Sequence, residues 1–218
     1  MSSASQRPRT RVTRAPDRAD YDLATIEAIL DAAPICHVGA IDERGFPVVI
    51  PTLHARIGEH LYLHGSTAGR TMKEAGRSEI CVTATLVDGL VLARSAFHHS
   101  INYRSVVIFG TGEVIEDETG KRDALEAFTE KLIPGRWVDV RLPNRQELKG
   151  TAVVRLPIDE SSAKVRTGGP VDEPEDYGLP VWAGTVPLRT VAGVPEADGD
   201  LNGTELPAYV ESYRRKHA

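Results

Sequence analysis

Two hydroxyls and two cations follow one another closely in the first half of the chain and could bind a phosphate group. Ser66 and Thr67 come first, and Arg70 and Lys73 follow three residues apart, so the two cations share a face if the segment is helical. A helix that starts directly after a strand presents free backbone N–H groups and positive dipole charge, and hydroxyl side chains cap such starts. We therefore predict an anion-binding helix start here; a solvated, well-capped surface helix is the alternative.

The strand that leads into this segment carries a histidine on its polar face. His60, Tyr62 and His64 alternate with Leu61 and Leu63, which is typical of a half-buried strand. His64 could hydrogen-bond a ligand or transfer a proton near neutral pH. A histidine in the barrel wall, bonded to a backbone carbonyl, is the alternative.

Two further strands carry residues suited to a flat aromatic ligand. The apolar stretch 47–52 contains Pro51, which cannot donate a ladder hydrogen bond and so marks an edge, a bulge or backbone that faces a ligand. A bulge that only curves the barrel is the alternative. Later in the chain, Tyr103 could stack on a ring, and Arg104 or Ser105 could make a second phosphate contact. A solvated strand start is the alternative there.

The spacing of the histidines does not predict a metal site. Zinc sites combine closely paired ligands, and His54, His60 and His64 have neither that spacing nor a cysteine or carboxylate to complete a set. His98 and His99 are adjacent, so only one of them would point at a given site in extended backbone. We therefore expect no metal.

Composition predicts an ordinary soluble protein. The chain has 218 residues, of which 41% are hydrophobic and 26% charged, and its net charge of -5 argues against nonspecific nucleic-acid binding. No apolar run approaches the ~20 residues of a membrane span, and the N-terminus lacks the apolar core of a signal peptide. Cys36 and Cys81 sit in apolar runs, where buried, reduced thiols are expected. These features predict a cytoplasmic protein with no nucleic-acid or membrane partner.

The element pattern predicts one mainly β domain between two less regular ends. Residues 1–20 are polar and rich in arginine and are expected to form a disordered arm. Residues 21–167 form the expected domain, and 168–218 form a C-terminal extension that packs on it or on a partner subunit. Helices are expected near 22–33, 67–75 and 117–132, and strands near 35–41, 48–55, 60–64, 80–86, 90–93, 104–116, 153–156 and 163–166. Short strands joined by tight turns favour a closed antiparallel barrel over a βαβ sheet.

Taken together, these blocks resemble the pyridoxamine 5'-phosphate oxidase-like, FMN-binding split-barrel superfamily, in the branch of nitroimidazole-resistance and related flavin-nucleotide-binding proteins. The resemblance runs from about Thr25 to Leu156. It rests on the order and spacing of residues 35–39, 47–52, 61–66, 69–73 and 102–107, followed by Gly110. It implies a six-stranded antiparallel split barrel that forms a homodimer, with two FMN sites in the clefts between the subunits.

The resemblance also implies which residues hold FMN. The stretch 48–52 would line the flavin ring, 64–67 would bracket the ring and the ribityl chain, and Arg70 and Lys73 would hold the 5'-phosphate. The expected cofactor site comprises Val48, Ile50, Pro51, Thr52, His64, Gly65, Ser66, Thr67, Arg70 and Lys73, to which the residue chemistry adds Tyr103 and Ser105. In the nitroimidazole-resistance branch a histidine near the cofactor is implicated in function. His64 matches it and is the expected catalytic residue.

The expected function is that of a flavin-dependent oxidoreductase acting on a small molecule. The oxidase proper carries a C-terminal signature rich in Trp, Arg, His and Asp. In this chain only Trp182 and Arg189 match it, and they match it weakly. Oxidation of pyridoxamine phosphate is therefore not supported. One alternative is a non-catalytic protein that holds FMN or haem, for which His54, His64, His98 and His99 are the candidate axial ligands. A deazaflavin-dependent reductase is the other.

Overall fold

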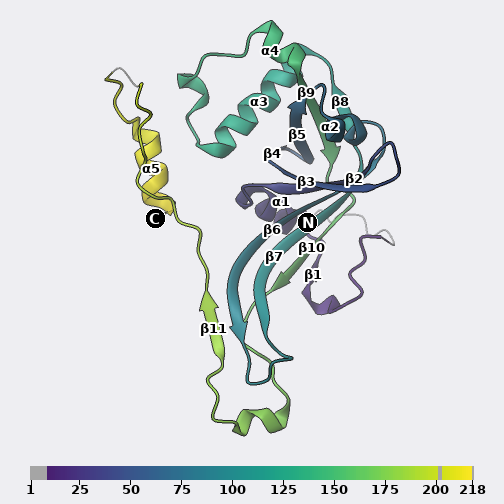
Figure 1. The fold of residues 1–218 in the computed structure, drawn as a ribbon, viewed down its shortest axis with the longest axis vertical. Helices are drawn as coiled ribbons and strands as arrows, with labels where there is room; N and C mark the ends of the chain where they lie inside the picture. The colour runs from purple at the N-terminus through teal and green to yellow at the C-terminus, as the bar shows by residue number, and fades with distance from the viewer. Residues whose placement is uncertain (1–8, 201–202, 218) are drawn as a thin grey trace.

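The computed structural model describes residues 9–200 and 203–217, without the side chains of residue 70 and residues 215–217. Its strands form two antiparallel sheets (Figure 1). The strands are β1 (Ala19–Asp20), β2 (Cys36–Ile41), β3 (Pro47–Thr52), β4 (His54–Ile57), β5 (His60–Ser66), β6 (Glu79–Leu92), β7 (Ser100–Thr111), β8 (Glu113–Ile115), β9 (Thr151–Pro157), β10 (Ser161–Arg166) and β11 (Gly184–Pro187). The helices are α1 (Leu23–Ala32), α2 (Arg70–Ala75), α3 (Glu118–Leu132), α4 (Arg145–Gly150) and α5 (Ala208–His217), with short 3-10 turns η1 (Pro16–Arg18), η2 (Trp137–Asp139) and η3 (Pro174–Gly178).

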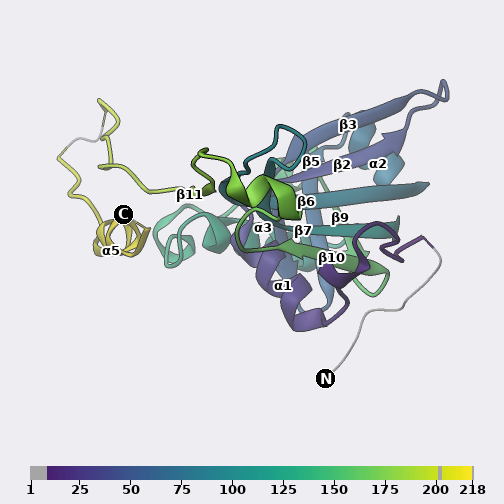
Figure 2. The same cartoon turned by 90° about the horizontal axis from the view of Figure 1, so that it is seen from below.

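The prediction of a mainly β fold with flanking helices is confirmed. The larger sheet has seven strands in the order β1-β10-β7-β6-β2-β3, with β11 added beside β6, and the smaller has four in the order β4-β5-β9-β8. Figure 2 shows the succession from β3 through β2, β6 and β7 to β10. Neither sheet has the six strands expected for the barrel.

The main core is built from side chains of both sheets and of α1. Leu61 and Leu63 of β5 contact the same cluster as Val82 and Ile108 of the larger sheet, and Leu30 of α1 completes it. All five are fully buried. Burying a side chain of this size contributes about 1.5–3 kcal/mol each. This cluster therefore sets the position of β5, from which the candidate site starts.

A second, smaller core lies under α3. Phe128 and Ala124 of this helix pack with Ala55, Ile115 and Val153. The Asp117 side chain caps the helix by accepting a hydrogen bond from the Gly120 N–H (2.7 Å). The polar face of β5, which carries Tyr62, turns toward this second core.

Residues 9–20, part of the segment for which the sequence predicts a disordered arm, contact the β domain in the structure. Arg9 forms ion pairs with Glu79 and Glu160, at 2.5 Å each, and its guanidinium lies over the ring of Phe109. Further on, β1 pairs with β10. These partners are distant in the sequence, so local composition does not reveal them. Residues 1–8 lie outside the described residues.

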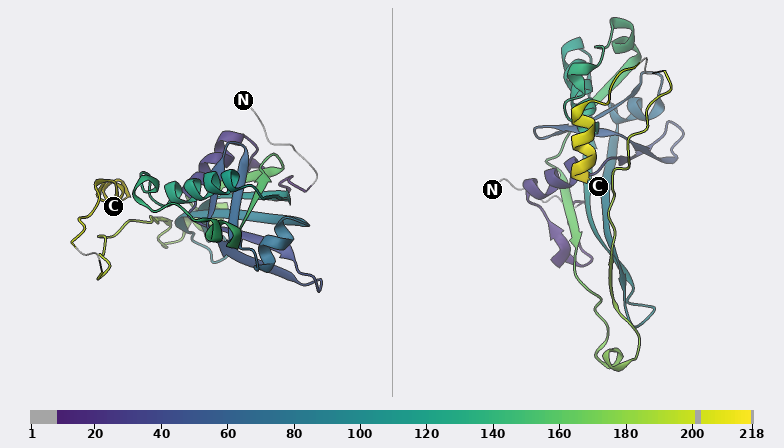
Figure 3. Two further views of the ribbon diagram at one scale, coloured as in Figure 1. Left: turned by 90° about the horizontal axis from the view of Figure 1, so that it is seen from above. Right: turned by 90° about the vertical axis from the view of Figure 1, so that its left-hand side faces the viewer.

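The C-terminal segment runs back along the molecule as an extended arm (Figure 3). It begins near the far end of the long β6–β7 hairpin, pairs with β6 through β11, and ends in α5. The Tyr209 hydroxyl of α5 accepts a hydrogen bond from Arg136 (2.9 Å). Among the described residues, no helix has the length and apolarity that crossing a bilayer requires.

Candidate functional site

A small apolar cleft lies between the edge strand β3 and helix α2. Its volume is about 40 Å³. Ala40, Asp42, Val48, Ile50, Thr71 and Glu74 line it. Ladder pairs place Val48 opposite Ala40 and Ile50 opposite Val38, so these side chains share one face of the sheet. The structure thus brings two of the expected flavin-ring residues, Val48 and Ile50, next to α2, and strand alternation puts Thr52 on the same face.

The loop that enters α2 differs from the predicted hydroxyl-capped start. The residue before the helix is Gly69, which has no capping side chain. The Ser66 hydroxyl instead accepts a hydrogen bond from the Ala68 N–H (3.2 Å), and the Ser66 carbonyl accepts one from the Gly69 N–H (2.8 Å). The Thr67 N–H donates to the Gly150 carbonyl (3.1 Å). The Ser66 hydroxyl bonds within the loop before the helix, so the first-turn N–H groups of α2 have no side-chain cap.

One of the two expected phosphate-binding cations stands free in the described part of the chain. Lys73 is exposed on α2 and forms no ion pair there. The Arg70 side chain lies outside the described residues, so only its backbone, at the start of α2, is placed. The cationic character of this helix therefore remains available to an anion.

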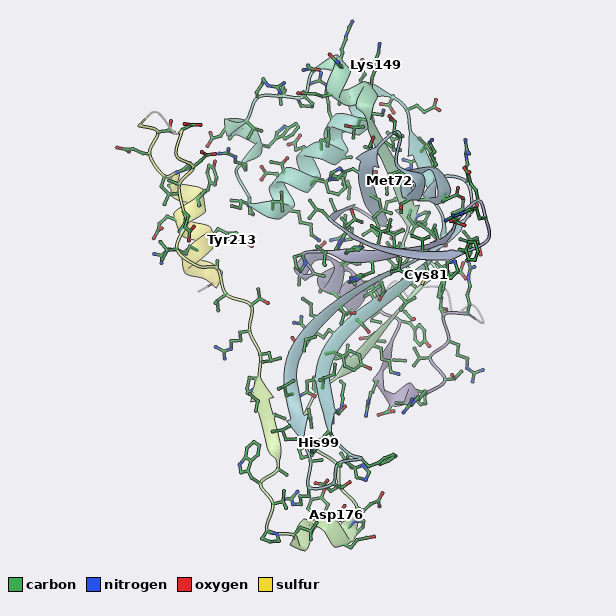
Figure 4. The ribbon with its side chains drawn as sticks, viewed as in Figure 1. Met72, Cys81, His99, Lys149, Asp176 and Tyr213 are labelled. Carbon is green, nitrogen blue, oxygen red and sulfur yellow. The ribbon has the colours of Figure 1, made fainter. Side chains whose placement is uncertain are left out.

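Two glycines hold α2 against the sheets. A Cβ on Gly65 would lie 2.9 Å from Cγ of Met72, so the helix packs directly on the backbone of β5. At the other end of α2, the Gly112 N–H donates to the Ala75 carbonyl (2.8 Å). Figure 4 labels Met72 on α2, and its side chain belongs to the main core. The sequence placed Gly65 in the cofactor site, and the structure gives it a packing role.

His64 points to the other face of β5. Its ring meets the Phe128 ring of α3 edge-on, with centroids 4.3 Å apart and planes at 71°. Burial lowers the pKa of His64, so its neutral form dominates at pH 7. Since Gly65 faces Met72 and neighbouring residues alternate, the structure separates His64 from the cleft beside α2.

Three other expected cofactor residues lie on the outer face of the larger sheet. Pro51 of β3 pairs with His37 of β2. On β7, Ser105 pairs with Lys164 and Tyr103 pairs with Arg166, both of β10. The Ser105 hydroxyl is bonded within the sheet, to the Lys164 carbonyl (3.4 Å). Within one chain, Tyr103 and Ser105 are therefore not brought to the α2 cleft. Arg104 points away from them and forms an ion pair with Asp88 (2.7 Å).

A buried polar cluster near the end of α3 was not predicted from the sequence. His54 is fully buried, and its Nε2 lies 2.8 Å from the Leu30 carbonyl and 3.0 Å from Nζ of Lys131. Lys131 also donates to the Leu30 carbonyl (2.7 Å). Burial, and then the Lys131 charge, lower the pKa of His54 to about 4, and burial lowers that of Lys131 to about 8. This cluster ties α1, β4 and α3 together.

The two cysteines are free thiols. Cys36 is fully buried, and burial raises its pKa to about 12, so the thiol stays protonated. Cys81 is only half-buried, on the outer face of the larger sheet, and burial raises its pKa as well. The expectation of buried thiols holds fully for Cys36 and partly for Cys81.

Comparison with protein families gives a match over most of the chain. The family model described as "Pyridoxamine 5'-phosphate oxidase" matches residues 22–165. A search of curated proteins finds no match.

Two solved structures match nearly the whole chain. The flavocytochrome Anf3 from Azotobacter vinelandii has 44% sequence identity and a TM-score of 0.91, and the match covers 95% of this chain and 97% of that one. The FAD and heme binding protein from Mycobacterium smegmatis has 37% identity and a TM-score of 0.86, with 90% of this chain and 97% of that one covered.

A third match is shorter. The putative 5-nitroimidazole antibiotic resistance protein from Bacteroides thetaiotaomicron has 27% identity and a TM-score of 0.55, and the match covers 67% of this chain and 86% of that one. The two nearly full-length matches therefore extend well beyond the segment that the family model spans, whereas this one leaves a third of the chain unmatched.

Proposed function

Because the chain belongs to the pyridoxamine 5'-phosphate oxidase family, we propose that it binds a flavin nucleotide and acts as a flavin-dependent oxidoreductase on a small molecule. The observation that carries this proposal is the nearly full-length similarity to a flavocytochrome, at 44% identity. The free thiols Cys36 and Cys81 are consistent with a reducing compartment, and we propose the cytoplasm.

The residues beside α2 fit a flavin nucleotide. Val48 and Ile50 offer an apolar surface for a flat ring, and Thr71 and the uncapped start of α2 offer polar groups at its rim. Lys73 and Arg70 supply positive charge for a phosphate. When bound, the flavin supplies the electron transfer, and the chain binds and orients it. FMN matches a single phosphate site, while FAD is the cofactor in the name of one relative.

We propose that the cofactor site is completed in a homodimer. Tyr103 and Ser105 lie on the outer face of the larger sheet, away from the α2 cleft of their own chain. The same face exposes Val49 and Val87, which are 66% and 47% exposed. A second copy packed on this face would bury these side chains, and its own Tyr103 and Ser105 would reach the cleft around the edge strand β3. Sedimentation equilibrium should then give about twice the chain mass of 23.7 kDa, and a monomer would contradict this part of the proposal.

A haem is the second cofactor that we propose, because both relatives that match nearly the whole chain are haem proteins by name. Of the four candidate axial ligands, His54 is held by its contacts with Leu30 and Lys131 in the core. His98 lies 3.6 Å from the Glu173 carboxylate. His99 accepts a hydrogen bond from the Ala93 N–H at Nδ1 (2.9 Å) and keeps Nε2. His64, neutral and half-buried, and His99 are thus the better candidates.

The absorption spectrum of the purified protein tests both cofactors. A flavin spectrum that bleaches with NADH or NADPH is expected for the proposed oxidoreductase, and a Soret band is expected if haem is also held. Mass spectrometry of the released flavin separates FMN from FAD. A protein that takes up neither flavin nor haem on reconstitution would contradict the proposed function, and a flavin that no donor reduces would favour a non-catalytic binding protein.

Replacing Lys73 with alanine is expected to weaken FMN binding by about 1.5–3 kcal/mol, the usual contribution of a charge-assisted hydrogen bond. The change leaves the fold intact because Lys73 is exposed and forms no ion pair among the described residues. Quenching of flavin fluorescence measures the affinity. Arg77→Ala is the matched control, since Arg77 is exposed just beyond the end of α2. If the Lys73 variant, the Arg77 variant and the unchanged chain bind FMN with equal affinity, the proposed contact between α2 and the phosphate is wrong.

A further inference from the structure

Arg166, the last residue of β10, is a buried guanidinium with only neutral partners. It is 6% exposed. Its Nη1 donates to the side-chain oxygen of Asn102, and its Nη2 donates to the Gly169 carbonyl (3.1 Å). Its Nε has no partner among the described residues. A buried charge is normally paired with an opposite charge, because neutral groups compensate only part of its lost hydration.

The surroundings of Arg166 add positive charge rather than neutralise it. Arg18 is the last residue of η1, which contacts β10, and it directly precedes β1, which pairs with β10 at Ala19 opposite Lys164. Neither Arg18 nor Lys164 forms an ion pair with a carboxylate in the described part of the chain. The Lys164 ammonium donates to the Arg14 carbonyl instead (2.8 Å). Burial, and then the charge of Arg18, lower the pKa of Arg166, while the nearby Tyr103 acts in the opposite sense.

Two carboxylates on the neighbouring strands, those of Asp88 and Asp20, are occupied. Asp88 pairs with Arg104, whose side chain lies on the opposite face of β7 from Tyr103. Asp20 of β1 accepts hydrogen bonds from the Asp22 N–H and the Thr25 hydroxyl, at 2.8 Å each. The chain as a whole is acidic, with a net charge of -5, so this concentration of unpaired cations is a local feature.

We propose that Arg166, Arg18 and the Tyr103 hydroxyl form an anion-binding site that takes a carboxylate or phosphate group. The Nε of Arg166, buried and without a partner among the described residues, and the neighbouring Nη form the planar edge with which a guanidinium binds such groups through two hydrogen bonds. Tyr103 lies directly opposite Arg166 in the ladder and carries a hydroxyl that can donate a further hydrogen bond. Within one chain, the site lies on the outer face of the larger sheet, away from the cations of α2. Its identification with a cofactor rests on the proposed function.

Binding of inorganic phosphate to the full chain tests the site without any cofactor. Titration calorimetry at constant ionic strength is carried out in a chain with Arg70→Ala and Lys73→Ala, which removes the other cationic segment. This chain is expected to bind phosphate, and adding Arg18→Gln or Tyr103→Phe is expected to weaken binding about 10-fold or more. Arg11→Gln is the matched control, because Arg11 is exposed in the same segment, and it is expected to leave the affinity unchanged.

These variants keep the test separate from folding. Arg166→Gln would also remove the contacts to Asn102 and Gly169. The Arg18 side chain, by contrast, forms no hydrogen bond or ion pair among the described residues, and Tyr103→Phe removes a single hydroxyl. Absence of phosphate binding in the starting chain, or equal affinities in the Arg18, Tyr103 and Arg11 variants, would overturn the proposal. Arg166 would then serve only to hold the end of β10.

Charged and neutral forms of each cofactor identify the source of the anion. Arg18→Gln is compared with the unchanged chain for FMN against riboflavin and for haemin against its dimethyl ester. A loss confined to FMN supports a flavin phosphate as the ligand, and a loss confined to haemin supports the haem propionates. Loss of phosphate binding alone supports an anionic substrate. If the unchanged chain binds neither cofactor, the proposed function is wrong. The phosphate titration still tests whether Arg166, Arg18 and Tyr103 bind an anion.

Discussion

Acidification from pH 7 to pH 4 is expected to lower the free energy of unfolding by about 3 kcal/mol through His54 alone. The pKa of His54 is about 4 in the folded chain, against 6.5 for the imidazole in the unfolded chain. Between these values the unfolded chain binds more protons than the folded one, so stability falls as the pH falls. The contribution is fully present above about pH 6.5 and is lost progressively toward pH 4. The cause is burial, since a charged imidazole would lie in the core beside the Lys131 ammonium.

Urea unfolding at several pH values between 4 and 7 measures this loss. His54→Gln removes the titrating group but keeps a hydrogen-bonding side chain, and it is expected to flatten the pH dependence over this range. His37→Gln is the control, since His37 is exposed on β2 and its loss is expected to leave the slope unchanged. The same slope in the two variants would mean that carboxylates, and not His54, dominate acid unfolding.

The local elements could be predicted from the sequence because apolar spacing determines which face of each is buried. The helix expected near 22–33 is α1 (Leu23–Ala32), and the one expected near 117–132 is α3 (Glu118–Leu132). Both have apolar residues at helical spacing, and the two cores bury Ile26, Ile29 and Leu30 of α1 and Ala124 and Phe128 of α3, whereas Leu132 at the end of the α3 stripe is exposed. The expected strand at 35–41 is β2 (Cys36–Ile41), whose inward side chains Cys36 and Val38 are fully buried.

The arrangement of the candidate site depends on pairing that local sequence does not encode. Neighbouring residues of one strand, such as Ile50 and Pro51 or His64 and Gly65, were assigned to one site, but alternation sends their side chains to opposite faces. The pairing of β5 with β9 joins residues far apart in the chain. The sequence therefore predicted candidate residues for the site and not how the two faces of the sheet divide them.

Buried charges were the other feature that the sequence did not predict. Arg166 is a strand-end arginine in the sequence, a position where a charged side chain usually points to solvent. Its guanidinium contacts the carbonyls of Gly168 and Gly169 in the following turn, and the N-terminal segment pairs with the same strand through β1. That segment was expected to be disordered, so nothing in the sequence indicated that it would enclose a cation.

Gly112→Ala is expected to destabilise the fold by about 3 kcal/mol, the upper end of the usual cost of overpacking a well-packed site. A Cβ at this position would lie 2.2 Å from Cγ1 of Val154 and 2.8 Å from the Ala75 carbonyl oxygen. The second contact is with backbone, and Ala75 is the last residue of α2. A rotamer change of Val154 would leave that contact in place, so α2 itself has to move.

If α2 holds the flavin phosphate as proposed, moving this helix should weaken flavin binding as well as lower stability. The Gly112 N–H donates to the Ala75 carbonyl (2.8 Å), so moving the helix also strains the hydrogen bond that holds its end. Chemical denaturation and flavin titration are measured on the same variant, with Gly150→Ala as the control, because no atom lies within 4 Å of a Cβ there. The control is expected to change stability by no more than about 0.5 kcal/mol. A helix that binds the flavin phosphate cannot shift without lowering flavin affinity. Destabilisation by Gly112→Ala with unchanged flavin affinity would therefore mean that flavin binding does not depend on the position of α2.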